Sequence, residues 1–183
     1  MIEIPFWTAE LIFAAIWLVC RIAVWIKRGR IDRKREALLM LMFVNLAVII
    51  RFTFFEMATV NGKVQPLLFD ANRILPFKIN AVPLVNLFDY ESKRELLLNV
   101  IGNTAMFIPS GIVLPALYKK LRSFGKTVAA GALISLCIEI LQLPLFTRTT
   151  DIDDLILNTL GVAIGYGIYA LARAIGKRKE DAK

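Results

Sequence analysis

The sequence predicts an all-α membrane protein, a bundle of five transmembrane helices, on three observations. First, 57% of the 183 residues are hydrophobic and the mean hydropathy is +0.62, whereas soluble domains average about 45–50% apolar residues. Second, the charged residues, 21% of the chain, gather in short clusters between long uncharged stretches. Third, the two cysteines lie inside apolar stretches and histidine is absent, which argues against a disulfide scaffold, histidine zinc sites and histidine catalysis.

The spans follow from length. A helix needs about 20 apolar residues to cross the hydrocarbon core of a bilayer, and five stretches meet this requirement. We expect one integral membrane domain over residues 1–183, with a basic tail at 174–183. The five spans are placed at residues 6–26, 38–59, 96–118, 126–146 and 153–172.

The basic clusters predict the orientation. They fall in residues 27–36, in residues 119–126 and after residue 172, and five spans put all three on one side of the membrane. Lysine and arginine are enriched in cytoplasmic loops, so this side is expected to be cytoplasmic and the N-terminus outside. The net charge of +8 then reflects topology and contact with anionic lipids, not nucleic-acid binding.

The connection at residues 60–95 is expected on the outer side. It is too long and too apolar for a structureless loop, and prolines at 66, 76 and 83 interrupt its apolar residues. We predict an interfacial or re-entrant segment lying against the outer leaflet.

Polar residues recur at one depth of the predicted spans. Ionisable groups inside a membrane are costly, and they usually face the bundle interior and serve function. With the orientation above, the intramembrane polar groups that are hard to explain otherwise all fall in the outer half of their helices, which predicts a polar layer beneath the outer membrane surface. The residues of this layer are Arg51, Glu56, Asn99, Asn103, Glu139, Gln142, Asp154 and Asn158.

Helical spacing supports a shared site. Residues three or four apart lie on one face of a helix, which aligns Ser135 with Glu139 and Gln142. A second stripe in the last span ends in Gly161-x-x-x-Gly165, a spacing that lets another helix approach closely. We therefore expect three helices to aim carboxylates and carboxamides at one point, with Arg148 capping it. The second stripe consists of Asp151, Asp154, Asn158, Gly161 and Gly165.

Structural roles compete with functional ones for several of these residues. On one interpretation Glu139 is a neutral acid whose hydrogen bonds hold helices together. On the other it is a functional acid. The asparagines serve interhelical hydrogen bonding or ligand contact. Either Asp151 or Asp153 is a candidate N-cap of the last helix.

The two arginines carry alternatives of their own. Arg148 either snorkels to the headgroups or pairs with Asp151 and Asp154. Arg51 lies too deep for easy snorkelling, so we expect a buried partner, Glu139 or Glu56.

Four blocks in order resemble the VanZ-like family. They are Asn80-Ala-Val-Pro83-Leu, Asn99-x-x-Gly102-Asn103-x-x-x-Phe107-Ile-Pro109-x-Gly111, Glu139-x-x-Gln142, and Arg148-x-x-Asp151-x-Asp153-Asp154-x-x-x-Asn158-x-x-Gly161-x-x-x-Gly165. The resemblance covers about residues 80–166, and Leu84 replaces the aromatic residue usual in the first block. It implies a multi-pass protein of the bacterial plasma membrane linked to resistance to teicoplanin, a lipid-bearing glycopeptide antibiotic.

Three function classes remain. The first is binding at the outer leaflet of a lipid headgroup, a lipid-linked cell-wall precursor or a lipoglycopeptide. Arginines would hold phosphate or carboxylate, and asparagines would hold sugar or peptide groups. The predicted ligand-binding residues are Arg51, Asn80, Asn99, Asn103, Gln142, Arg148, Asp151 and Asn158.

The second class is a membrane enzyme that modifies a lipid-linked phosphate or sugar headgroup. Its catalytic residues would be Glu139, as general base, and Asp154. Mg²⁺ or Mn²⁺ would bind at Asp151, Asp153 and Asp154, although no cofactor is evident and no known metal motif is present. The third class, a proton-coupled transporter, has the required buried acid but no inverted repeat. Membrane lipids are the expected partners in each case, and the sequence does not choose between binding and catalysis.

Overall fold

The computed structural model describes residues 1–56, 59–73, 79–83 and 92–181. Within them, five helices are long and apolar enough to cross a membrane, which confirms the predicted class of an all-α membrane protein. The chain forms two compact units, a first of Met1–Ile79 and Ile138–Thr150 and a second of Asn80–Cys137 and Asp151–Lys183. Each unit is described by itself, and the expected single membrane domain stays a prediction.

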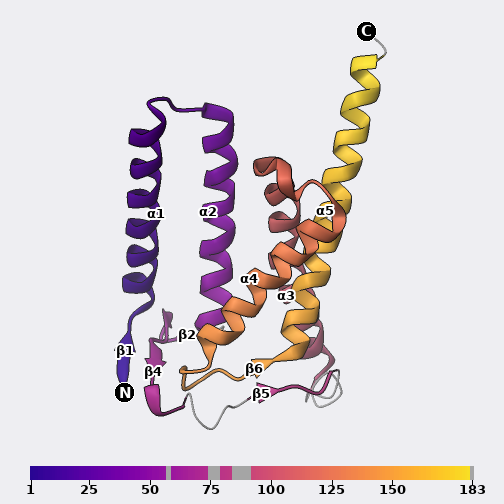
Figure 1. The fold of residues 1–183 in the computed structure, drawn as a ribbon. Coiled ribbons are helices and arrows are strands. Elements are labelled where there is room, and N and C mark those ends of the chain that lie inside the picture. Colours follow the sequence, from indigo (N-terminus) through magenta and orange to yellow (C-terminus); the bar gives the residue numbers. More distant parts are fainter. Residues whose placement is uncertain (57–58, 74–78, 84–91, 182–183) are drawn as a thin grey trace. The chain divides into compact units, whose positions relative to one another are not determined.

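The first unit is built on a helical hairpin. Helix α1 (Phe6–Arg28) and helix α2 (Arg33–Phe54) run antiparallel and are joined by a short turn (Figure 1). Gly29 ends α1 with φ +61 and donates its N–H to the carbonyl of Trp25, and the side chain of Asp32 caps α2. The two helices contact through stacked rings of Phe13 and Phe43, whose centroids lie 5.2 Å apart.

Short strands accompany this hairpin. Strand β1 (Ile2–Ile4) pairs antiparallel with β4 (Leu67–Phe69), and β2 (Thr59–Val60) pairs with β3 (Lys63–Val64). The β2–β3 turn uses Asn61 and Gly62, both at positive φ, as a two-residue type I′ hairpin requires. After β4, a 3-10 turn, η1, covers Ala71–Arg73.

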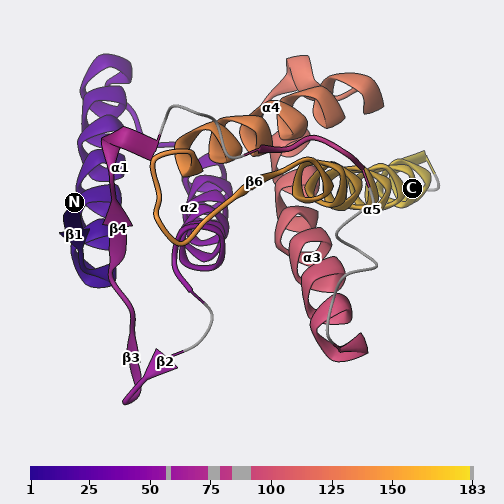
Figure 2. The same cartoon turned by 90° about the horizontal axis from the view of Figure 1, so that it is seen from below.

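The second unit rests on a close helix pair. Helices α3 (Lys93–Leu117) and α5 (Ile152–Asp181) lie side by side in Figures 1 and 2. Glycines set their separation: a Cβ on Gly161 would lie 2.1 Å from the carbonyl oxygen of Thr104, and one on Gly111 would lie 2.2 Å from that of Val162. The predicted close approach at Gly161 and Gly165 is confirmed, and its partner helix is α3.

The remaining elements connect these pairs. A 3-10 turn, η3 (Lys119–Leu121), follows α3 and leads to α4 (Phe124–Gln142), whose residues through Cys137 belong to the second unit. Strands β5 (Ile79–Asn80) and β6 (Thr150–Asp151) form a two-stranded sheet. In the second unit the core includes Phe107 and Val162, both fully buried.

Several predicted helix limits were wrong. Helix α2 starts before residue 38, because Asp32 caps it, and it ends at Phe54 instead of residue 59. Helix α4 ends at Gln142 instead of residue 146, and Pro144 follows within two residues. Helix α5 continues past residue 172 to Asp181, because a polar helix can extend beyond the apolar stretch that spans a membrane.

The outer segment is described only in part. Residues 60–73 hold the short strands and η1, and residues 79–83 hold the end of β5 and a turn. Residues 74–78 and 84–91 lie outside the described residues, and Leu84 is among them. The interfacial or re-entrant placement of this segment therefore stays a prediction.

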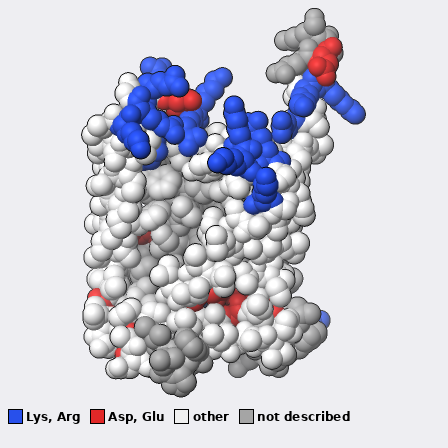
Figure 3. All heavy atoms as spheres, in the orientation of Figure 1, with Lys and Arg blue, Asp and Glu red and all other residues white. Residues whose placement is uncertain are grey.

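The cations gather where the sequence clusters them (Figure 3). In the first unit they lie over the α1–α2 turn, the upper left of the picture. In the second unit they follow the end of α3 and the C-terminal part of α5. The α1–α2 turn and the helix ends beside it, residues 27–36, hold six cations against two acids, and positive charge of this kind marks helix ends at the membrane surface.

Candidate polar site

A cluster of polar side chains lies at the start of α5 in the second unit. We call it the α5 cluster and define it by the residues that join α5 and β6 to their neighbours. Asn103 of α3 donates its Nδ2–H to the carboxylate of Asp154. A weaker contact of 3.5 Å links Asn103 to Asn99, one helical turn before it. The members of the α5 cluster are Asn80, Asn99, Asn103, Ser135, Asp151, Asp153, Asp154 and Asn158.

Asp151 performs the capping role that the sequence left open. Its Oδ1 accepts the backbone N–H of Asp153 at 2.9 Å, the contact expected of an N-cap with the second helical residue. The amide of Asn80 donates to both carboxylate oxygens of Asp151, at 3.2 and 3.3 Å. Asp153 lies inside the helix and is 5% exposed. The capping residue is thus Asp151, and the same carboxylate also anchors β5.

Asn158 brings α4 to the cluster. Its Nδ2–H donates to Oγ of Ser135 at 2.9 Å, and the two residues are 1% and 0% exposed. Among the described residues the Oδ1 of Asn158 is buried and has no hydrogen-bond partner. A buried polar atom without a partner costs about 1–3 kcal/mol. The α5 cluster therefore retains an acceptor that a ligand's hydroxyl or N–H group would satisfy.

The first unit holds the acid that the sequence singled out. Glu139 is 3% exposed, and its backbone carbonyl accepts the hydroxyl of Thr150 at 2.8 Å. Gln142, one turn later, donates its amide to the carbonyl of Thr53 near the end of α2. The Oε1 of Gln142 is buried without a partner in the part of the chain that the structure describes. A second buried acceptor is therefore present one turn from a buried acid.

Arg148 closes the C-terminal end of α2. Its Nη2 donates to the carbonyls of Phe52, at 3.2 Å, and Phe55. The last four carbonyls of a helix have no partner within the helix, and a cation is favourable near them. The guanidinium thus fixes the segment after α4 to the end of α2 within the first unit.

Arg51 contacts Glu56, one of its two expected partners, through the backbone of that residue. Its Nη1 donates to the backbone carbonyl of Glu56 at 3.1 Å. The guanidinium also lies over the rings of Phe6, at 5.6 Å, and Phe52, at 5.3 Å. The predicted partner Glu56 is present, but Arg51 bonds its main-chain carbonyl and lies over the rings of Phe6 and Phe52.

The structure brings together part of the predicted site. In the second unit, Asn103 bonds Asn99 and Asp154, Asn80 bonds Asp151, and Asn158 bonds Ser135, whereas Arg51, Glu139, Gln142 and Arg148 belong to the first unit. The meeting of both sets in a single chamber stays a prediction. Sequence reasoning missed Thr53 and Thr150, whose contacts follow from tertiary packing and have no sequence signature.

The described carboxylates form no evident metal centre. Across residues 1–56, 59–73, 79–83 and 92–181, no group of three or more His, Cys, Asp or Glu side chains is placed to hold a metal ion. The oxygens of Asp151 and Asp154 accept amide hydrogen bonds instead. A Mg²⁺ or Mn²⁺ site at Asp151, Asp153 and Asp154 stays a prediction.

Comparison with known proteins identifies relatives. The family model described as VanZ/LLP1 matches residues 37–173, so the likeness extends beyond the 80–166 stretch to include most of α2. The chain is 37% identical over 83 residues to Protein VanZ of Enterococcus faecium, an alignment that covers 45% of this chain and 51% of that protein. The chain thus spans about half the length of this relative. No solved structure matches. A family match over most of the chain is decisive: this membrane protein belongs to the VanZ/LLP1 family.

Proposed function

We propose that this protein binds the polar head of a lipid or of a lipid-linked envelope molecule at the outer leaflet, through the α5 cluster. The single observation that carries the proposal is the buried, partnerless Oδ1 of Asn158. In the same helix, Asp154 accepts a hydrogen bond from Asn103 of α3, and Asn158 itself donates one to Ser135 of α4. Polar groups in a membrane are expensive, and keeping one unpaired is consistent with a ligand that completes it.

The chemistry of the cluster favours a neutral or hydroxyl-rich head. Carboxamides both donate and accept hydrogen bonds, and ionised carboxylates only accept them. Asn103 and Asp154 together would therefore receive sugar hydroxyls or peptide N–H groups. The helices beside them expose large apolar residues such as Leu97, Ile101 and Ile156, which suits a ligand whose tail stays in the bilayer.

The family supports the ligand class as an expectation. The resemblance implies a link to teicoplanin resistance, and teicoplanin carries both a lipid and a glycopeptide. A lipid-linked cell-wall precursor combines a similar polar head with a long apolar tail. Both belong to the proposed class, and the orientation with the N-terminus outside and the C-terminus in the cytoplasm would put the α5 cluster in the leaflet that they reach.

The test is the lipid content of the purified protein. Wild type and Asn103→Ala are purified from a bacterial membrane, and bound lipids are measured by mass spectrometry against the bulk membrane. The matched control is Thr159→Ala, because the Thr159 hydroxyl bonds the Leu155 carbonyl of its own helix at 2.7 Å. We expect wild type and the control to retain a polar lipid in clear excess over its share of the membrane, and Asn103→Ala to lose this excess.

Two outcomes oppose the proposal. Wild-type protein that carries lipids in bulk-membrane proportions has no selective site. Asn103→Ala that retains as much of the enriched lipid as Thr159→Ala moves the site away from the α5 cluster. Elution volume and thermal unfolding of each variant establish that the folded protein is being compared.

Burial of Glu139 favours a second candidate, a membrane enzyme acting on the same class of headgroup. A carboxylate that is 3% exposed is suited to take a proton from a nucleophile once bound substrate excludes water. Glu139→Gln keeps the shape and loses the base. Under this candidate the variant would still retain the enriched lipid, while any change that wild type makes to that lipid would cease. Loss of turnover with a chelator, and its return with Mg²⁺ or Mn²⁺, would add the metal.

A further inference from the structure

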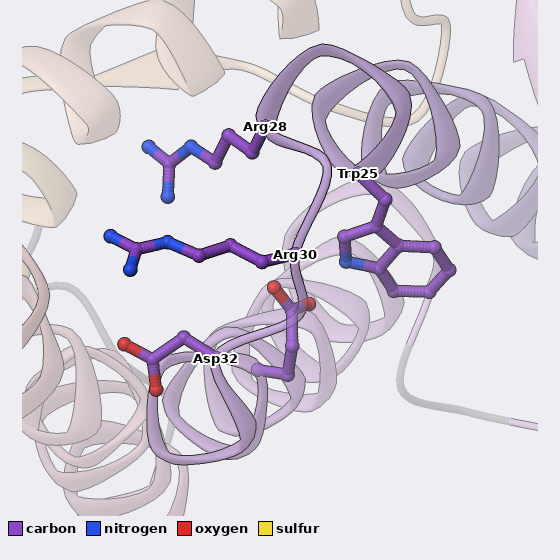
Figure 4. A pocket seen from close by; sticks show the side chains of 5 residues that line it. Trp25, Arg28, Arg30 and Asp32 are labelled. Carbon is purple, nitrogen blue, oxygen red and sulfur yellow. The ribbon is translucent and has the colours of Figure 1, made fainter.

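A polar hollow lies at the α1–α2 turn of the first unit. It has a volume of about 260 Å³ and is lined by Trp25, Arg28, Arg30, Asp32 and Glu36. Figure 4 shows the side chains of Arg28 and Arg30 extending from the turn in the same direction, with Asp32 beside them. Both arginines are exposed, so their guanidinium groups are accessible from outside the protein.

The backbone of the turn is held by a helix cap at each of its two ends. Gly29 adopts φ +61 and ends α1 between the two arginines, and its N–H bonds the carbonyl of Trp25 at 3.0 Å. A left-handed residue at this place is a common helix termination and glycine adopts it without strain. The carboxylate of Asp32 accepts the N–H of Arg35 at 3.2 Å and starts α2. Both ends of the four-residue connection are therefore capped.

The acids of the hollow are already engaged. Arg21 donates two hydrogen bonds to the carboxylate of Glu36, one of them from Nε to Oε2 at 3.0 Å. The same guanidinium lies 5.8 Å from the centre of the Trp25 ring. Glu36 is thus neutralised from one side, and Asp32 caps α2. The charges of Arg28 and Arg30 exceed that of the remaining acid, Asp32, so the hollow is net positive.

We propose that this hollow binds the phosphodiester of an anionic phospholipid. Guanidinium groups bind phosphate oxygens in bidentate fashion, which two neighbouring arginines provide. The turn joins two membrane spans, so it lies where lipid headgroups are concentrated. Trp25 forms one wall, and indole rings settle at the depth of headgroups in membrane proteins. A phosphatidylglycerol head brings a phosphate without a cation, whereas the choline of phosphatidylcholine would add positive charge to a positive site.

The site uses residues of the first unit only and does not depend on the α5 cluster. Its test measures lipid binding to the intact protein by native mass spectrometry in detergent, titrated with phosphatidylglycerol or phosphatidylcholine. The pocket variant is Arg28→Gln with Arg30→Gln. The control is Arg33→Gln with Lys34→Gln, which removes the same charge from the same turn at exposed residues that do not line the hollow.

We expect wild type to prefer phosphatidylglycerol. Each arginine removed from the hollow should weaken that binding by about fivefold, the equivalent of about 1 kcal/mol for a basic residue at a membrane surface. The control should stay within about twofold of wild type, because Arg33 and Lys34 do not line the hollow. Inorganic phosphate at equal concentration should not displace the lipid, because it lacks the acyl chains that hold the lipid in the detergent micelle beside the turn.

Three results would overturn the proposal. Equal binding of the two lipids removes the charge selectivity. An equal loss in both double variants assigns the effect to diffuse positive charge instead of the hollow. Displacement by inorganic phosphate assigns the site to a free anion. Loss of lipid-head binding in the Asn103→Ala test leaves this result unaffected, since the two tests use different residues in different units.

Discussion

Asn103 and Asp154 stand 51 positions apart in the sequence and are joined by a hydrogen bond from amide to carboxylate. The bond ties the N-terminal half of α3 to the first turn of α5. It becomes available because Gly161, two turns along α5 from Asp154, lets the two backbones come close. Close packing at Gly161 thus brings Asn103 and Asp154 within hydrogen-bonding distance.

Alanine at Gly161 is expected to destabilise the protein. The added Cβ would meet the Thr104 carbonyl at 2.1 Å, and such overpacking costs about 1–3 kcal/mol. Gly167→Ala is the control, because nothing lies within 4 Å of its Cβ and alanine favours helix by about 1 kcal/mol. Unfolding in mixed SDS micelles measures both. A Gly161→Ala protein as stable as Gly167→Ala would contradict the close approach.

The Asn158–Ser135 hydrogen bond is expected to couple α4 to α5. Single and double alanine variants at these two residues form a double-mutant cycle, from which we expect a coupling free energy of about 0.6 kcal/mol, with an upper value of about 1.7 kcal/mol. Unfolding in mixed micelles supplies the four stabilities. Thr159→Ala paired with Ser135→Ala should show no coupling, since Thr159 bonds its own helix. Additive effects at positions 158 and 135 would refute the bond.

Arg148→Ala is expected to loosen the end of α2. The guanidinium donates to two carbonyls there, and hydrogen bonds to charged groups contribute about 1.5–3 kcal/mol. Arg148→Lys should recover part of that stability, because lysine keeps the charge but lacks the planar fork. Thermal unfolding in detergent measures each. If Arg148→Ala leaves the unfolding temperature unchanged, the two hydrogen bonds do not stabilise the protein, and a role of Arg148 in ligand binding is favoured instead.

The orientation predicts which residues a membrane-impermeant thiol reagent reaches in intact cells. In a background with Cys20 and Cys137 replaced by alanine, Lys63→Cys of the β2–β3 hairpin should label from outside. Lys34→Cys should label only after the cells are opened. Both lysines are exposed. Labelling of position 34 but not of position 63 in intact cells would reverse the assigned topology.

The sequence predicts this fold to a large extent because the bilayer sets strict rules. Twenty apolar residues must be a helix there, so five spans could be placed from composition alone. Their ends could not. Asp32 starts α2 because its carboxylate caps the N–H of Arg35, and a capping aspartate looks like any other acid in a charged stretch.

The candidate site was only partly predictable for a similar reason. The spacing of Asp151, Asp154 and Asn158 puts them on one stripe, and the structure gives each a partner in the second unit. Spacing carries no information about partners on other segments. Arg21 and Glu36 illustrate this: each looks ordinary at the end of a span, and only the hairpin brings them into contact.

Under the proposed function, the contact between Gly161 and Thr104 would also govern access to the α5 cluster. Where two backbones touch, no acyl chain can slip between them, so the seam of α3 and α5 below Asn158 excludes hydrocarbon. A molecule with a long tail would have to leave that tail outside the seam and offer only its head to Asn103 and Asp154. The glycines would therefore select ligands by their shape, in addition to holding two helices together.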